Sequence, residues 1–247
     1  MEAGLIEGKK IDFLTRFDRV QQSSSIRFIL PRPVWRLMRY LNIGSQGVLR
    51  EDWLELNKYV KNIIEARTKC GDFELKDDLL SMYVRTAKSS GKNYMMEESY
   101  LIDAIFNFMI AGRDTTSCAL TNLFKLLPTN PSAQEKMIEE LDRIVGRENF
   151  VSWDHIRELR YCGAVFNEVL RLYPPVGGDS RFVVEDDVLP SGIQVQAKQR
   201  VSFPNIAIGR DPHLWTEPDK FIPERWLQDD KPTRRPDEYM FPVFWGG

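Results

Sequence analysis

Apolar residues recur at helical spacing over an unusually long stretch, residues 93–127. The apolar positions are Leu101, Ala104, Ile105, Phe108, Met109, Ala119, Leu120, Leu123 and Phe124. Steps of three and four residues are typical of an α-helix. Because both flanks of the centre are apolar, the pattern predicts a long helix that crosses a core.

Polar residues interrupt this pattern at its centre, in the hexapeptide A-G-R-D-T-T from Ala111 to Thr116. Gly112 lowers helix propensity, and Asp114 and Thr115 compete for backbone hydrogen bonds. An ionised carboxylate on a core helix is costly unless it has partners or water. We therefore expect a helix locally loosened around a polar pocket, with a threonine hydroxyl bonded back to the carbonyl near Ala111. A solvent-facing turn is the alternative.

Shorter periodic segments predict the remaining elements. Helices are expected at 11–20, 50–69, 77–87, 132–145, 152–159 and 161–173. The segment 27–44 is bounded by proline and rich in Trp and Arg, which fits either a membrane-facing patch or a packed loop with a short helix. Residues 181–204 alternate and break at Ser191-Gly192, which predicts a β-hairpin.

Composition excludes some classes of protein. The 247 residues are 43% hydrophobic and carry a net charge of −2, with no long basic run, so a generally basic nucleic-acid binder is excluded. No run of 18 apolar residues occurs, and the N-terminus lacks the apolar stretch of a signal peptide. The chain is expected to be soluble or only peripherally attached to a membrane.

Cysteine and histidine usage gives no metal-binding pattern. Cys70, Cys118 and Cys162 are widely spaced and form no C-x-x-C pair, and His155 and His213 lie far apart. This usage fits a reducing compartment and predicts neither a disulfide scaffold nor a zinc or histidine metal site.

Two Glu-x-x-Arg pairs occur, Glu140 with Arg143 and Glu168 with Arg171. At average residue usage roughly one such pair arises by chance in a chain of this length, so the spacing alone decides nothing. The first pair is interpreted as a solvated surface pair. The second lies among apolar residues in a helix that ends at two prolines and precedes the extended segment, and this context distinguishes it from the first.

The hexapeptide resembles the oxygen-activating helix of the haem-thiolate monooxygenases, the cytochromes P450. In that family two small residues let the haem and dioxygen approach the backbone, and an acid and an alcohol deliver protons. The resemblance implies that Ala111 and Gly112 are the small residues next to the cofactor. It implies that Asp114 is the acid and Thr115 the hydroxyl, both catalytic.

Other segments resemble the same family. The helix of Glu168 and Arg171 is similar to its Glu-x-x-Arg helix, and Pro223-Glu224-Arg225-Trp226 resembles the P-E-R-F/W motif of its meander. The resemblance implies a buried ion triad of Glu168, Arg171 and Arg225 with a structural role. Arg181 falls where the family often places an arginine against a haem propionate; a simple strand-edge arginine is the alternative.

The last residues, F-P-V-F-W-G-G, resemble the opening of the haem-binding loop, with Phe244 and Gly247 at its first and fourth positions. The arginine and the thiolate cysteine of that motif are not in the sequence. The resemblance implies one partial domain over residues 1–247, mainly α with a small β portion. It would hold the substrate-roof helices, oxygen-activating helix, Glu-x-x-Arg helix, meander and start of the haem loop. This is the C-terminal half of the cytochrome P450 fold, incomplete at both ends.

The implied activity of the complete protein is insertion of one oxygen atom from dioxygen into a C–H bond of a hydrophobic substrate. Residues 13–69 resemble the long-chain fatty-acid hydroxylase branch, which implies a long-chain fatty acid. Haem would be the cofactor, with electrons from NADPH through a reductase. The complete protein would be a monomer at the cytosolic face of the endoplasmic reticulum membrane. The alternative is a truncated, non-catalytic fragment without haem, at most a lipid-binding or interaction module.

Overall fold

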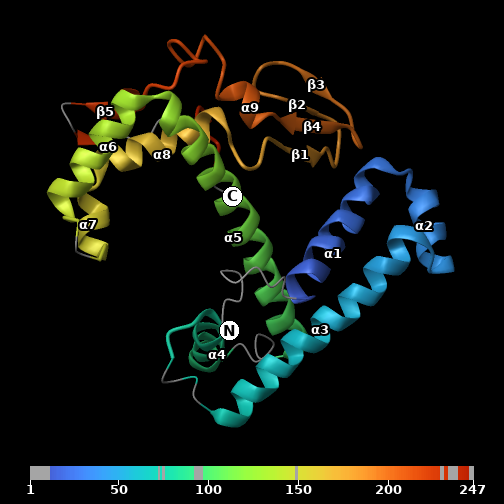
Figure 1. Ribbon diagram of the computed structural model, residues 1–247. Coiled ribbons are helices and arrows are strands. Elements are labelled where there is room, and N and C mark those ends of the chain that lie inside the picture. The colour runs from blue at the N-terminus through green and yellow to red at the C-terminus, as the bar shows by residue number, and fades with distance from the viewer. Residues whose placement is uncertain are drawn as a thin grey trace. The chain divides into compact units, whose positions relative to one another are not determined.

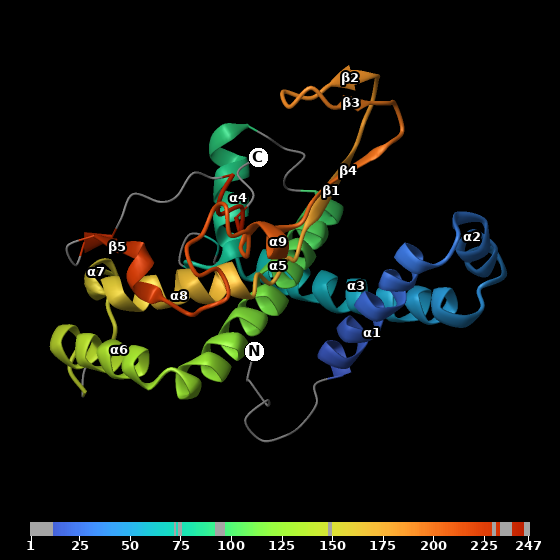
Figure 2. The same ribbon diagram turned by 90° about the horizontal axis from the view of Figure 1, so that it is seen from above.

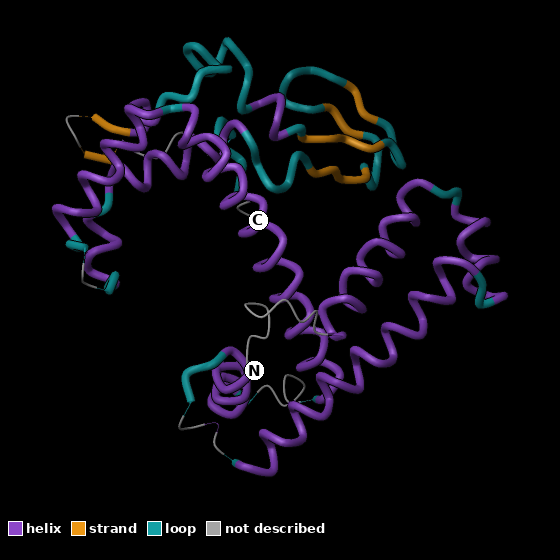
Figure 3. Tube along the Cα trace, viewed as in Figure 1, coloured by secondary structure: helices purple, strands orange, loops and turns teal. Residues whose placement is uncertain are grey.

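Helices make up most of the described residues, and among these residues short antiparallel strand pairs appear only in the C-terminal part of the chain (Figure 1, Figure 3). The computed structural model describes residues 12–71, 73, 76–91, 97–147, 150–228, 231–232 and 239–244. Two compact units can be distinguished, Met1–Ile110 and Ala111–Gly247. The boundary falls within one long helix, α5 (Glu98–Leu126).

The first unit is built from helices. Besides the beginning of α5, it contains α1 (Asp12–Ile29), α2 (Arg32–Leu41), α3 (Gly44–Cys70) and α4 (Leu79–Ser90). α1 packs along α3, as Figure 1 shows. The core of this unit consists of Phe17, Leu56, Val60, Ile64, Leu101, Ile102 and Phe106. Leu56, Val60 and Ile64 follow one another at intervals of four residues, so the predicted apolar face of α3 is the face that is buried.

Two predicted boundaries in this unit are wrong. α1 continues to Ile29 rather than ending at residue 20, and α3 begins at Gly44 rather than at residue 50. The polar run Q-Q-S-S-S after residue 20 interrupts the apolar periodicity, and its serines have only intermediate helix propensity. Packing against α3 nevertheless keeps this stretch helical, and Ser23 within it is buried.

The proline-bounded segment forms a short helix, α2, as one of the two alternatives allows. Pro33 lies in its first turn, where a missing N–H costs nothing. Asn42 ends the helix in the left-handed conformation, with φ 54°, and this turn leads directly into α3. None of the residues of α2 is fully buried.

α5 is one unbroken α-helix through the hexapeptide Ala111 to Thr116. The expected local loosening of the backbone is therefore wrong, because the polar residues find partners without interrupting the helix. Leu101 and Phe106 belong to the core of the first unit, and Leu123 belongs to a core of the second. Over the part of the chain that the structure describes, no helix is both long enough and apolar enough to cross a membrane.

The second unit combines further helices with short strand pairs. Its elements after α5 are α6 (Pro131–Ile144), α7 (Trp153–Glu158), α8 (Arg160–Leu172), β1 (Asp179–Phe182), β2 (Asp187–Val188), β3 (Gln194–Val195), β4 (Arg200–Phe203), α9 (Asn205–Ile208), a 3₁₀ turn (Pro223–Trp226), β5 (Leu227–Gln228) and β6 (Lys231–Pro232). α6 and α8 lie side by side in both views (Figure 1, Figure 2). Leu123, Val165 and Val169 form part of the core beneath them.

The helix ends follow their sequence signals. Gly146, with φ 77°, follows α6, where a left-handed residue commonly ends a helix. Ser152 caps α7: its hydroxyl accepts the backbone N–H of His155, and the imidazole of His155 accepts the backbone N–H of Ser152.

The extended segment forms two antiparallel ribbons rather than one. β1 pairs with β4, and β2 pairs with β3 in a tight hairpin that turns at Gly192, with φ 82°. Figure 2 shows the β2–β3 ribbon projecting away from α8. The turn was predicted at Ser191-Gly192, and glycine is favoured there because its backbone is left-handed.

Candidate active site

A cavity of about 340 Å³ opens on one face of α5 in the second unit. Its lining residues are Ala111, Thr115, Thr116 and Ala119 from α5, Phe166 and Leu170 from α8, Pro175 and Val176 from the loop after α8, and Val243 and Phe244 from the C-terminal segment. The helix that carries Glu168 thus supplies the opposite wall. Apart from the two threonine hydroxyls the lining side chains are apolar, so the expected polar pocket is a mainly apolar one.

Residue spacing explains why this face of α5 is open. Ala111, Thr115 and Ala119 are four residues apart and so lie one above another on the helix. Their small side chains leave room where Leu123, one step further along, fills the core. Sequence reasoning identified Ala111 and Thr115 but missed Ala119, although the same four-residue spacing would have found it.

The hydroxyl of Thr115 donates to the carbonyl oxygen of Ala111 at 2.5 Å. This is the back-bond that the sequence predicted, and the prediction is confirmed. A threonine hydroxyl has one donor and two acceptor positions. With its donor engaged on the helix, Thr115 presents acceptor positions to the cavity.

Asp114 and Gly112 do not line the cavity. The carboxylate of Asp114 is 48% exposed and lies 3.8 Å from Nε of Arg113. It is therefore partly solvated rather than buried in a core, which removes most of the cost expected for an ionised group on this helix. A methyl group placed on Gly112 would meet no atom within 4 Å. The close-approach role of Gly112 stays a prediction.

The other residues predicted to contact the cofactor lie in different places. Phe244 lines the cavity with a ring that is 76% exposed. Arg181, on β1, is exposed and pairs with the carboxylate of Asp179 on the same strand. This position fits the alternative of a strand-edge arginine, and contact with a haem propionate stays a prediction. Gly247 lies outside the described residues.

The structure brings Glu168, Arg171 and Arg225 together. Nη2 of Arg171 lies 2.8 Å from Oε1 of Glu168, and Nε of Arg225 lies 3.0 Å from the same oxygen. The side chains of Glu168 and Arg171 have no exposed surface. A buried ion pair is tolerated only when its geometry is good and the remaining polar atoms also have partners.

Those remaining partners come from the polypeptide that follows the strands. Glu168 also accepts Nε1–H of Trp226 and the backbone N–H of Ile222, both at 2.9 Å. Arg171 donates to the carbonyl oxygens of Gly209, Pro218 and Lys220. Two charged side chains of α8 thereby hold residues 209–226, which have little regular structure of their own. The sequence motifs predicted the three charged residues of this network, but they did not predict that Trp226 donates a hydrogen bond to Glu168.

The second Glu-x-x-Arg pair corrects the sequence interpretation. Glu140 is only 8% exposed, so it is not a solvated surface residue. Its carboxylate oxygens accept the backbone N–H groups of Tyr161 and Cys162, each at 2.8 Å. These donors belong to the first turn of α8, where helix N–H groups have no partner within the helix. Glu140 therefore caps α8 from α6, while Arg143 is exposed.

None of the three cysteines lines the cavity. Cys70 is exposed, and Cys118 and Cys162 are half-buried. Burial, and then the carboxylate of Glu140, raise the pKa of Cys162 to about 12, so its thiol stays protonated at neutral pH.

Comparisons with known proteins agree with this arrangement. A family model described as cytochrome P450 matches residues 4–244. The chain is 36% identical over 247 residues to cytochrome P450 94A1 of Vicia sativa, covering 95% of this chain and 46% of that protein. It is 34% identical over 242 residues to cytochrome P450 94C1 of Arabidopsis thaliana, covering 96% and 47%.

Among solved structures, a mutant heme domain of cytochrome P450DA superposes with a TM-score of 0.78 at 20% identity, covering 97% of this chain and 50% of that one. This likeness shows the fold, and the mainly helical fold expected from the sequence is confirmed. The chain spans about half the length of the curated relatives it matches. By its match to the family model and to these relatives, the chain belongs to the cytochrome P450 family.

Proposed function

We propose that the complete protein is a haem-dependent monooxygenase and that this chain supplies the wall of its active site at which protons are delivered. The observation that carries the proposal is Thr115, whose hydroxyl lines a mainly apolar cavity between α5 and α8. The hydroxyls of Thr115 and Thr116 can hold water for proton transfer at one place, while the apolar side chains exclude water from the rest of the cavity.

The residues around the cavity fit one face of a haem. Ala111 and Ala119 are small enough for a flat ring to approach α5, and Phe166, Leu170 and Val176 offer apolar contact. When bound, haem supplies the redox chemistry with dioxygen. The thiolate ligand expected for this family is not one of Cys70, Cys118 and Cys162, since none lines the cavity. We therefore expect the 247-residue chain by itself to be catalytically silent.

The proton route follows from the positions of two neighbouring residues. Asp114 is half exposed and can exchange protons with solvent, and Thr115 beside it faces the cavity. A water held by the acceptor positions of Thr115 would receive a proton that enters at Asp114, a general-acid role through water. Gly112 lies next to Ala111 but does not line the cavity, so its proposed part is to keep the neighbouring backbone of α5 free of a side chain.

The proposed substrate is a long-chain fatty acid. Support comes from the apolar lining of the cavity and from the resemblance of residues 13–69 to fatty-acid hydroxylases. Dioxygen, NADPH and a reductase complete the proposed reaction, in which one oxygen atom enters a C–H bond and the other leaves as water.

Thr115→Ala in the complete protein tests this proposal. The matched control is Thr121→Ala: Thr121 also donates to the carbonyl four residues before it, at 2.7 Å, but does not line the cavity. We expect Thr115→Ala to lower the hydroxylated fatty acid formed per dioxygen consumed by about 100-fold, the low end for loss of a positioned proton donor. Thr121→Ala should leave this ratio unchanged.

A carbon monoxide difference spectrum of each variant verifies equal haem loading, so that loss of cofactor is not mistaken for loss of proton delivery. Unchanged coupling in Thr115→Ala at equal haem content would show that the hydroxyl has no role in proton delivery.

A further inference from the structure

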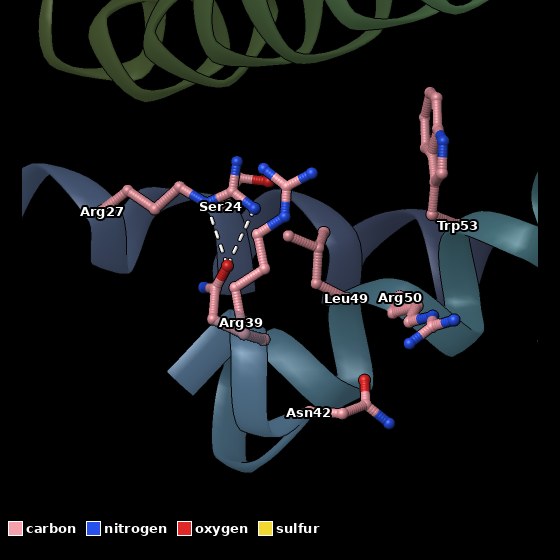
Figure 4. A pocket seen from close by; sticks show the side chains of 8 residues that line it. Ser24, Arg27, Arg39, Asn42, Leu49, Arg50 and Trp53 are labelled. Carbon is pink, nitrogen blue, oxygen red and sulfur yellow. Dashed lines mark hydrogen bonds between the residues drawn. The ribbon is translucent and has the colours of Figure 1, made fainter. Parts of the chain in front are cut away.

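A second cavity, of about 510 Å³, lies in the first unit among α1, α2 and α3. It is lined by Ser24, Arg27, Arg39, Asn42, Gln46, Leu49, Arg50 and Trp53 (Figure 4). Three of these side chains are guanidinium groups and none is a carboxylate. In Figure 4 the side chain of Arg39 extends from α2 toward the guanidinium of Arg27 on α1.

Within the described part of the chain, no carboxylate neutralises the positive charge of this cavity. Among the residues that the structure describes, no ion pair involves Arg27, Arg39 or Arg50. The same helix α1 shows the contrast: Arg16 and Arg19 both bind the buried carboxylate of Asp52, at 2.9 and 2.6 Å. Guanidinium groups remain charged at any ordinary pH, so the charges repel one another until an anion joins them.

Gln46 adds an unused donor at the same place. Its Oε1 accepts Nε–H and Nη2–H of Arg27, at 3.1 and 2.8 Å, which fixes which end of the amide is the nitrogen. Gln46 is 3% exposed, yet its Nε2 has no hydrogen-bond partner. Buried donors are almost always satisfied, so this nitrogen indicates a missing acceptor. Trp35, whose ring centre lies 5.1 Å from Cζ of Arg27, helps to hold that guanidinium in place.

The N-terminus of α3 points to the same chemistry. Gln46 lies in the first turn of this 27-residue helix, and the N-cap residue Ile43 makes no side-chain capping bond. The unbonded N–H groups and the helix dipole therefore give this end of α3 a positive potential. Arginines, an uncapped helix end and a buried unpaired donor all favour an anion.

We propose that this cavity binds an oxyanion carried by an aliphatic chain, such as a carboxylate or a lipid phosphate. Arg27, Arg39 and Arg50 would share its charge, since guanidinium forks match the planar oxygens of such groups. Leu49 and Trp53 give the same wall an apolar stretch for the adjoining chain. All residues of the site belong to the first unit, and none of them lines the cavity of Thr115.

Calorimetric titration of the full chain tests the site. The probes are sodium dodecanoate below its micelle concentration, inorganic phosphate, and vesicles of phosphatidylcholine with and without phosphatidic acid. The variant Arg39→Gln with Arg50→Gln removes two lining charges. The control Arg32→Gln with Arg36→Gln removes two charges from α2 outside the cavity.

We expect the lining variant to weaken binding of dodecanoate or of phosphatidic-acid vesicles at least about tenfold, which corresponds to about 1.4 kcal/mol. The control should weaken it less than about twofold, a difference of about 0.4 kcal/mol. Binding of dodecanoate identifies a free carboxylate, and binding of phosphatidic-acid vesicles alone identifies a head group. Equal weakening in both variants, or binding of none of the probes, would overturn the proposal.

Gln46→Glu provides a second, independent test. A carboxylate at this position would neutralise Arg27 from within and occupy the anion site. We expect the thermal midpoint of the variant to rise and its binding of the anionic probes to be lost. A variant that keeps the affinity of the native chain for these probes would contradict the assignment of Gln46 to the site.

Discussion

The carboxylate of Glu140 on α6 accepts the backbone N–H of Tyr161 in the first turn of α8 at 2.8 Å. With the N–H of Cys162 bound to the other oxygen, one side chain satisfies two of the otherwise orphaned donors of α8. Leu159, the N-cap residue of α8, provides no capping bond of its own. The cap thus comes from a different helix, and it fixes α8 against α6.

Glu140→Ala is accordingly expected to destabilise the folded chain. The change leaves two donors without acceptors, which typically costs about 1–3 kcal/mol. The measurement is the free energy of unfolding in urea. Glu139→Ala, at an exposed neighbouring position on α6, is the control and should change that free energy by less than about 0.5 kcal/mol. Equal stability of the two variants would mean that Glu140 is no cap.

Glu168→Ala should cost more than Glu140→Ala. Removing this carboxylate leaves the charge of Arg171 buried and unpaired, and it frees Trp226 and Arg225. A broken buried ion pair typically costs about 3–5 kcal/mol. Urea unfolding, together with limited proteolysis of residues 209–226, measures the effect. A cost below that of Glu140→Ala would contradict the role assigned to the triad.

Two glycines of the second unit should respond in opposite directions to alanine. A methyl group on Gly209 would lie 2.4 Å from the carbonyl oxygen of Arg171, a backbone atom that cannot easily yield. Gly209→Ala is therefore expected to cost about 1–3 kcal/mol. Gly163→Ala, in α8 with nothing within 4 Å, should stabilise by about 0.5–1 kcal/mol. The thermal midpoint of unfolding should fall in Gly209→Ala and rise in Gly163→Ala, and the opposite change in either variant would contradict the prediction.

Cys162 should be slow to react with thiol reagents in the native chain. Burial, and to a smaller extent the carboxylate of Glu140, raise the pKa of Cys162 to about 12, whereas a free cysteine has a pKa of about 8.5. Because the folded pKa is the higher one, the native thiol holds its proton at pH 8, whereas unfolding converts a fraction of it to the reactive thiolate.

The measurement is labelling by dithionitrobenzoate at pH 8 in a Cys70→Ser, Cys118→Ser chain, so that only Cys162 reports. We expect slow labelling that accelerates in urea and as pH rises toward 12. A Cys118→Ser, Cys162→Ser chain, which keeps exposed Cys70, serves as the fast control. Native Cys162 reacting as fast as Cys70 would contradict the predicted protection.

The sequence determined the elements of this protein because helical periodicity, caps and turns are local properties of the chain. The long helix α5, the Ser152 cap and the turn at Gly192 could all be read from neighbouring residues. The back-bond of Thr115 to Ala111 was predictable for the same reason, since both atoms lie in one helical turn.

The tertiary structure decided which polar groups meet across elements. Glu140 and Glu168 have the same Glu-x-x-Arg spacing, but one binds the N–H groups of α8 and the other binds Arg225 and Trp226. Gln46 and Arg27 come together only because α1 packs against α3. Such contacts depend on how apolar faces pack, and a periodic pattern shows which face is buried but not what it will touch.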